Sequence, residues 1–227
     1  MLETRFKGAI FDFNGTLFFD AKKHEVAWGK FAIDIRGHAF TEEELVQQIY
    51  GRSNRSILEY LLKREIPDDV LQFFVAKKED FYRHICLQDK KNLKLVDGAI
   101  PLFEYFTGQE IPMTIATASE ITNLRFFNEQ FGLDTWFDMD KVVYDDFKII
   151  GKPAPDMFLS ATQKLGLNPA ECIIFEDSTS GVQAAKTAGI GSIIVVDPLG
   201  EQSSFKDHPD VDLVIADFTQ FNTDRYF

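Results

Sequence analysis

Asp12 is the first residue of this chain whose position suggests chemistry. It stands at the end of the apolar segment GAIF and comes just before a turn through Asn14 and Gly15. Burying a carboxylate at the end of a strand costs free energy unless a cation offsets its charge. Such a residue is therefore a candidate for binding a cation or for catalysis. Asn-Gly between apolar segments is also the favoured two-residue hairpin turn, so a plain hairpin is an alternative interpretation of this segment.

Three further segments carry polar side chains beside apolar runs. They contribute Thr117 and Ser119 in MTIATAS, Lys152 in GKPAP, and Glu176 with Asp177 after CIIF. Simpler explanations exist for two of them, because the hydroxyl pair could cap the following helix and the lysine could be an exposed loop charge. The adjacent acids are harder to explain in this way, since two carboxylates repel each other unless a cation lies between them.

Hydrophobic periodicity predicts the elements that must position these residues. Short apolar runs with strand character occur at residues 7–13, 113–119, 172–178 and 192–197. Between the first two, helical spacing predicts four helices instead, at residues 22–33, 42–49, 56–64 and 69–85. We therefore predict an α/β fold with a Rossmann-like parallel-sheet core, formed by residues 1–17 and 95–227, and an inserted α-helical cap domain, residues 18–94.

Turn signals and topology add two expectations to this prediction. Gly132, Gly166 and Gly189 stand where the helices of the core should end. In a parallel sheet, the loops that leave the carboxyl ends of the strands form the ligand crevice. The polar residues at these strand ends should therefore belong to one site.

Composition excludes several classes of protein. The 227 residues carry 36 Asp and Glu against 24 Lys and Arg, and the net charge of −12 argues against binding to nucleic acid or an anionic membrane. Two cysteines, Cys86 and Cys172, suggest neither a disulfide framework nor a structural zinc site. No run approaches the roughly 20 apolar residues of a membrane span, and the N-terminal segment lacks a cleavage signal. We expect a cytoplasmic protein; its oligomeric state is open.

In this order and spacing, the four polar segments resemble the signature motifs of the haloacid dehalogenase superfamily of phosphotransfer enzymes. The resemblance covers essentially the whole chain. It is closest to the branch with a helical cap after the first strand, which includes beta-phosphoglucomutase and phosphoglycolate phosphatase. The resemblance implies a phosphatase that acts on a small phosphorylated metabolite.

The resemblance also implies roles for the acidic residues. Asp12 would attack phosphorus and form an aspartyl-phosphate that water then hydrolyses. Mg²⁺ would be held by Asp12, Asp177 and the backbone carbonyl of Asn14, with Glu176 as a further ligand or as the holder of a metal-bound water. Such a cation is needed because an anion must approach a phosphate dianion in an acidic protein.

Other residues would then bind the phosphoryl group. Thr117 would donate its hydroxyl, the Ala118 N–H would lie beside it, and Lys152 would bridge nucleophile and phosphate. Ser178 is a further candidate for binding substrate, although it could instead only cap the next helix.

In the predicted cap, the segment YGRSNRS supplies Arg52, Ser53 and Asn54 as candidates for binding substrate, with a solvated, capped helix start as the alternative. His24, one helical turn before Trp28, resembles a position of the related mutase's cap and is a candidate to bind substrate; the same spacing is also ordinary helix packing. Lys77 and Lys78 could face the crevice, but we expect them to be solvated.

Asn14 departs from the family pattern, because many of these enzymes carry there a second aspartate that protonates the leaving oxygen and activates water. An amide cannot transfer that proton, and general acid–base catalysis contributes about 10²- to 10⁴-fold. Three hypotheses remain: a phosphatase that is slow on ordinary esters or suited to acyl phosphates, a sugar-phosphate mutase, and a phosphate-ligand binder or regulatory protein without turnover. Dehalogenation is disfavoured, because Lys152 and Asp177 suit phosphate and metal.

Overall fold

The computed structural model describes residues 6–49, 53–200 and 203–227. The chain divides into two compact units. One unit contains Met1–Phe19 and Lys94–Phe227 and is called the core unit; the other contains Asp20–Leu93 and is called the helical unit. Each unit is described by itself.

The core unit is built on a six-stranded sheet in which every pair of neighbouring strands is parallel. The order across the sheet is β3-β2-β1-β4-β5-β6, so β1 lies between β2 and β4. This is the strand order of a Rossmann-like fold, which confirms the predicted fold class. The strands are β1 (Gly8–Phe11), β2 (Met113–Glu120), β3 (Val143–Asp145), β4 (Cys172–Glu176), β5 (Ser192–Val196) and β6 (Leu213–Ile215).

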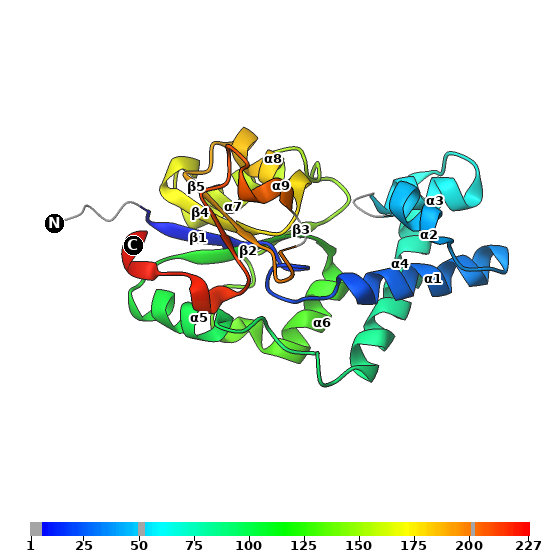
Figure 1. Cartoon of the computed structure of the whole chain (residues 1–227), viewed down its shortest axis with the longest axis horizontal. Helices are drawn as coiled ribbons and strands as arrows, with labels where there is room; N and C mark the ends of the chain where they lie inside the picture. Colours follow the sequence, from blue (N-terminus) through cyan, green and yellow to red (C-terminus); the bar gives the residue numbers. More distant parts are fainter. Residues whose placement is uncertain (1–5, 50–52, 201–202) are drawn as a thin grey trace. The chain divides into compact units, whose positions relative to one another are not determined.

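Helices cover both faces of this sheet, as Figure 1 shows, with α7 and α8 on one side and α5 and α6 on the other. The helices are α5 (Ala99–Gly108), α6 (Ile121–Phe131), α7 (Asp156–Leu165), α8 (Thr179–Ala188) and α9 (Ser203–Lys206). Four short 3₁₀ helices complete the unit: η2 (Leu133–Thr135), η3 (Pro169–Glu171), η4 (Phe218–Gln220) and η5 (Thr223–Arg225). Because both faces are covered, β1 is apolar throughout and β4 is apolar up to Glu176 at its end.

Left-handed glycines end three of these helices, as the sequence predicted. Gly132, Gly166 and Gly189 follow α6, α7 and α8 with φ values of 63°, 72° and 75°. The sequence did not predict β3 and β6. Each is only three residues long, which is too short to show a strand periodicity.

Phenylalanine fills one layer of the core. Phe11 of β1 stacks on Phe175 of the neighbouring β4, with ring centroids 4.8 Å apart. Phe103 of α5 and Phe218 of η4 meet Phe11 edge-on, at 5.3 and 5.9 Å. These contacts anchor the central strands whose ends carry the polar residues.

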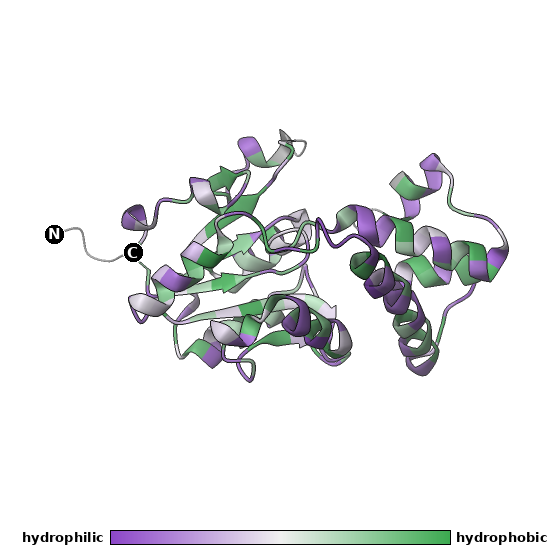
Figure 2. Cartoon of the chain, turned by 90° about the horizontal axis from the view of Figure 1, so that it is seen from below, coloured by the Kyte–Doolittle hydropathy of each residue, from purple (hydrophilic) through white to green (hydrophobic). Residues whose placement is uncertain are grey.

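The helical unit contains the predicted helices and a small core of its own. They are α1 (Ala21–Arg36), α2 (Glu42–Glu44), which continues as the π-helix η1 (Leu45–Ile49), α3 (Asn54–Leu62) and α4 (Asp68–Gln88). Figure 2 shows that these helices carry both hydrophobic and hydrophilic residues. The buried residues of this unit's core are Trp28, Phe31, Ala32, Ile49, Ile57, Leu58, Leu61, Ile66 and Val75.

No helix among residues 6–49, 53–200 and 203–227 combines the length and the apolar character needed to cross a bilayer.

Candidate active site

The candidate site lies at the carboxyl ends of β1, β2 and β4, which are neighbours in the sheet. The chain leaves β1 toward Asp12, β2 ends with the segment that contains Thr117, and β4 ends at Glu176. Strand order reverses its direction at β1, and such switch points form crevices in open parallel sheets. The topology thus brings together segments that are more than 100 residues apart in the sequence.

Lys152 joins two buried carboxylates. Its Nζ lies 2.5 Å from Asp12 Oδ1 and 2.5 Å from Glu176 Oε1. The lysine side chain is only 7% exposed, which excludes the alternative that it is a solvated loop charge. A point charge between two acids offsets a repulsion that burial would otherwise make severe.

Glu176 is held on its other oxygen as well. Oε2 accepts hydrogen bonds from the backbone N–H groups of Asp177 and Ser178, both at 2.7 Å, and from Ser178 Oγ at 2.9 Å. Gly181 leaves the space that this carboxyl group fills, because a Cβ there would lie 1.9 Å from Glu176 Cδ. The carboxylate is therefore fixed in one orientation.

These contacts determine the charge states of the buried pair. Burial alone would lower the pKa of Lys152, but the charges of Asp12 and Glu176 raise its pKa above the usual value. Burial alone would raise the pKa of Glu176, but Lys152 and the Ser178 donors hold its pKa below the usual value. Both groups are charged at neutral pH.

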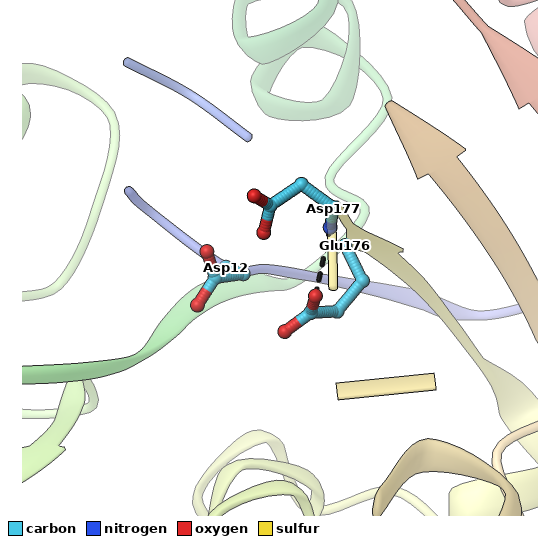
Figure 3. Close-up of side chains that lie close together, drawn as sticks. All are labelled: Asp12, Glu176 and Asp177. Carbon is cyan, nitrogen blue, oxygen red and sulfur yellow. Dashed lines mark hydrogen bonds between the residues drawn. The ribbon is translucent and has the colours of Figure 1, made fainter. Parts of the chain in front are cut away.

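Three carboxyl groups could hold a metal ion at this site. Asp12, Glu176 and Asp177 each offer an oxygen, and the three oxygens lie within 4.8 Å of one another. Figure 3 shows the three side chains together, with the hydrogen bond from the Asp177 N–H to Glu176 dashed. Gly15 has φ +81°, and a Cβ there would lie 2.0 Å from Asp177 Oδ2. An all-oxygen set in a space kept clear by glycine fits Mg²⁺.

Asn14 contacts the end of β2 through its side chain. Its Oδ1 accepts a hydrogen bond from Ser119 Oγ at 2.7 Å and a longer one from Thr117 Oγ1 at 3.4 Å. The turn at Gly15 is not a hairpin, because β1 pairs in parallel with β2 and β4. Thr117 and Ser119 do not cap α6 either, since that role belongs to Glu120, whose carboxylate accepts from two N–H groups of its first turn.

The helical unit holds a buried polar cluster of its own around His24. The imidazole stacks on Tyr82 with centroids 4.0 Å apart, its Nδ1 lies 3.0 Å from Lys78 Nζ, and its Nε2 lies 3.3 Å from Asp20 Oδ2. Lys78 is 2% exposed, so the expectation that it is solvated was wrong; its ammonium also contacts Glu79. Burial is possible because these partners replace water.

The other residues of the helical unit that the sequence suggested for substrate binding or for solvation have simple structural roles or lie outside the described residues. Ser53 caps α3, since its Oγ accepts from the Ser56 N–H at 3.2 Å, and Asn54 is the first residue of that helix. Arg52 lies outside the described residues. Lys77 pairs with Asp34 at a half-exposed position, as expected of a solvated residue.

Sequence reasoning missed two features of the site in the core unit. Ser119 was expected among the polar residues at the strand ends, with a helix cap as the alternative, but the contact of its hydroxyl with Asn14 was not predicted. Gly181 carried no signal, because a glycine inside a helical segment does not show what occupies the space beside it. The pairing of Ser178 with Glu176 could have been suspected from the capping position just after two acids.

Comparisons with known proteins show the family of the chain. Residues 6–189 match the model of the haloacid dehalogenase-like hydrolase family. The fructose-1-phosphate phosphatase of Escherichia coli (strain K12) is 30% identical over 193 residues, which cover 84% of this chain and 97% of that protein.

Solved structures extend the agreement to the whole chain. A haloacid dehalogenase-superfamily hydrolase, family IA variant 3, of Entamoeba histolytica superposes with a TM-score of 0.90 at 36% identity, covering 97% of each chain. A beta-phosphoglucomutase from Clostridium difficile shares the fold, with a TM-score of 0.76 at 21% identity, over 97% of this chain and 95% of that one.

The chain belongs to the haloacid dehalogenase-like hydrolase family. Within this family it is a hydrolase of the phosphatase type.

Proposed function

We propose that this protein is a Mg²⁺-dependent phosphatase that acts on a small phosphorylated metabolite through an aspartyl-phosphate on Asp12. The observation that carries the proposal is the ion pair of Lys152 with Asp12 and Glu176, both at 2.5 Å. Lys152 holds the Asp12 carboxylate in place, and it offers a positive charge where a phosphate dianion must approach.

In the proposed reaction, the residues of the core unit have different roles. An oxygen of Asp12 attacks phosphorus while the bond to the leaving oxygen breaks, and Lys152 reduces the repulsion between the two anions. Thr117 Oγ1 and the Ala118 N–H are the proposed donors to the phosphoryl oxygens. Ser178 holds Glu176, and its hydroxyl is a further proposed contact to substrate.

Asp12, Asp177, the Asn14 carbonyl and Glu176 would hold Mg²⁺, which when bound neutralises phosphate charge and helps to align the phosphoryl group. The acidic cluster and the clearance at Gly15 support this assignment.

Phosphorylated sugars are the substrate class that we propose first. The support is the fructose-1-phosphate phosphatase among the relatives of the chain. The helical unit would act as a cap that selects the leaving group, with Arg52, Ser53, Asn54 and His24 as proposed contacts. We propose a cytoplasmic location, which the free cysteines Cys86 and Cys172 fit.

Asn14 limits the leaving groups that this site can release. A sugar alkoxide needs a proton as it departs, and an amide cannot supply one. Turnover of sugar phosphates should therefore be slow, whereas an acyl phosphate releases a carboxylate that needs no proton.

A substrate panel with Mg²⁺ tests the proposal. Wild type, Asp12→Asn and Asn14→Asp would be compared for phosphate release from an aryl phosphate, acetyl phosphate and several sugar phosphates. We expect wild-type turnover of at least one substrate, loss of it in Asp12→Asn, and faster turnover of sugar phosphates in Asn14→Asp. If wild type releases phosphate from none of them, the protein is a binder without turnover; normal activity of Asp12→Asn would remove the mechanism.

A further inference from the structure

Two hydroxyl groups set the orientation of the Asn14 amide in the core unit. Ser119 Oγ donates to Asn14 Oδ1 at 2.7 Å, and Thr117 Oγ1 donates to the same oxygen at 3.4 Å. Thr117 Oγ1 also accepts from the Ser119 N–H at 3.1 Å, so its own proton is available for Asn14 while the site holds no phosphoryl group. Once a phosphoryl group takes that proton, Ser119 alone holds the Asn14 oxygen. The carbonyl edge of the amide therefore faces the end of β2, and the NH₂ edge faces the other way.

This arrangement would accept an aspartate without a change of shape. One carboxylate oxygen would take the two hydrogen bonds from Ser119 and Thr117, and the other oxygen would occupy the place of Asn14 Nδ2. The difference is chemical, because an oxygen there accepts a proton and an amide NH₂ group does not. The hydroxyl groups of Ser119 and Thr117 cannot replace a carboxylate as the base, since hydroxyl groups do not take up protons near neutral pH.

We propose that Ser119 holds Asn14 as a hydrogen-bond donor, and that phosphorylated Asp12 is in consequence a long-lived species in this protein. The inference rests on the proposed function, because it requires Asp12 to be the phosphoryl acceptor. It adds that the second half of the reaction, and not the first, limits turnover when the phosphoryl donor is an acyl phosphate.

The two half-reactions differ in their need for a base. In the first, an Asp12 oxygen bonds to phosphorus and the donor's carboxylate leaves with the electron pair of the broken P–O bond, so no proton moves. In the second, a water oxygen bonds to phosphorus, Asp12 leaves as a carboxylate, and the water must give up a proton. Without a base at position 14, that proton goes directly to solvent or to phosphate, and the step is slow.

Acetyl phosphate with Mg²⁺ is the probe that separates the half-reactions. The full chain would be mixed with it, desalted into chelator-free buffer, quenched in acid at intervals, and measured by intact mass and peptide mapping. Wild type should gain one HPO₃ group on Asp12 and lose it slowly. Asn14→Asp should lose it about 10²- to 10⁴-fold faster. Asp12→Asn should gain nothing.

Ser119 is a positioning residue in this scheme. Ser119→Ala removes the shorter hydrogen bond, so the amide can turn its carbonyl toward the attacking water. The carbonyl still cannot take the proton, but it can orient the water by accepting a hydrogen bond, and the lifetime of phosphorylated Asp12 should fall about fivefold. Ser119→Thr should restore it. A purely structural role would instead lower the melting temperature or the extent of phosphorylation, and an unchanged lifetime in Ser119→Ala would overturn the assignment of Ser119.

The outcomes separate this inference from the proposed function. If neither wild type nor Asn14→Asp gains HPO₃ or releases phosphate, the proposed function fails. If wild type releases phosphate rapidly and never accumulates phosphorylated Asp12, only the long-lived species is refuted. Phosphorylation of Asn14→Asp alone would also refute it, because loading from an acyl phosphate should need no acid at position 14.

Discussion

At the scale of single residues, Lys152 supplies the positive charge that allows two carboxylates to be buried side by side. Asp12 is 5% exposed and Glu176 is fully buried, and both carboxylates contact the same ammonium group. Without that charge, two acids would face each other in a region of low dielectric. The lysine thus offsets the charge of both carboxylates, and in the proposed mechanism the same ammonium group faces the phosphate.

We expect Lys152→Met to lower kcat/KM by about 10²- to 10³-fold or more, because the charge that offsets the phosphate dianion is lost. The free energy of unfolding should fall by about 3 kcal/mol, since removal of one partner leaves buried carboxylates uncompensated. Steady-state kinetics and urea denaturation measure the two effects. Lys141→Met, at a half-exposed lysine beside Asp138, is the control and should change neither.

Gly15→Ala tests the clearance beside Asp177. The new Cβ would lie 2.0 Å from Asp177 Oδ2 at a residue with φ +81°, so Asp177 must move. We expect Mg²⁺ affinity, measured by calorimetry, to fall about 10- to 100-fold.

Gly166→Ala is the matched control, because Gly166 has φ +72° but nothing lies within 4 Å of the methyl group that the substitution adds. It should cost about 1 kcal/mol of stability through backbone strain alone and leave Mg²⁺ affinity unchanged. Equal Mg²⁺ affinity in both variants would show that Asp177 is not a metal ligand.

At the scale of elements, the start of α8 organises the acidic side of the site. Ser178 caps this helix by accepting from the Gly181 N–H at 3.0 Å, and the same hydroxyl donates to Glu176. One capping residue therefore begins the helix and orients a carboxylate of the preceding strand. The absence of a side chain at Gly181 provides the space in which that carboxylate lies.

We predict that Gly181→Ala lowers activity and costs about 1–3 kcal/mol of stability, because a methyl group would displace the Glu176 carboxyl group. Gly29→Ala is the control within another helix, α1, where nothing lies within 4 Å of the added methyl group. That change should instead stabilise the protein by up to about 1 kcal/mol. Thermal denaturation and kinetics of both variants make the comparison; a stabilised, fully active Gly181→Ala would contradict it.

An ion pair between Glu44 and Arg36 links elements of the helical unit. The Glu44 carboxylate accepts hydrogen bonds from both terminal nitrogens of Arg36, at 2.6 and 2.8 Å. It also accepts from the Tyr60 hydroxyl at 2.5 Å and from the Thr41 N–H at 2.8 Å. Hydrogen bonds from Arg36, then Tyr60 and Thr41, hold the pKa of Glu44 well below its usual value of 4.5. The contact joins the end of α1 to α2 and α3.

Because the pKa of Glu44 is lowered in the folded state, its stabilisation should be complete above about pH 4.5 and fall as pH drops toward that lowered pKa. Glu44→Gln should therefore cost about 1 kcal/mol at neutral pH and progressively less in acid. Glu43→Gln, which changes an exposed acid of the same helix, is the control. Urea denaturation of the three proteins between neutral and acidic pH tests this, and a constant difference across that range would contradict it.

At the scale of the whole molecule, the C-terminal segment completes the core unit. Phe218 packs on Phe11 and Phe175 at 5.9 and 5.3 Å, and its N–H donates to the Asp97 carbonyl before α5. Figure 1 shows this segment, in red, beside α5 on one face of the sheet. The strand that precedes Asp12 is thus buried by residues from the opposite end of the chain.

Phe218→Ala should cost about 3–5 kcal/mol, because it opens a cavity against the two central strands. Phe147→Ala removes a ring that is 43% exposed and should change stability by no more than about 0.5 kcal/mol. Chemical denaturation of the two variants is the measurement. Similar losses in both would mean that the C-terminal segment is not part of the cooperative core.

The fold class and the residue types of the site could be predicted from the amino-acid sequence alone. Apolar runs that alternate with helical segments were sufficient for the α/β fold, and glycines marked the ends of three helices. The periodicity of local side chains carries this information, because burial repeats every two residues in a strand and every 3.6 in a helix. The strands β3 and β6 were not predicted, because three residues are too few to show the two-residue periodicity of a strand.

Which side chains meet, and what each one faces, depended on the packing of the folded chain. The order of β2, β1 and β4 brings Lys152 between Asp12 and Glu176, although 140 residues separate the lysine from Asp12. The burial of Lys78, the space at Gly181 and the contact of Ser119 with Asn14 likewise arise only in the folded chain. A local pattern cannot encode the site, because the site forms when crossovers place separate strand ends at one edge of the sheet.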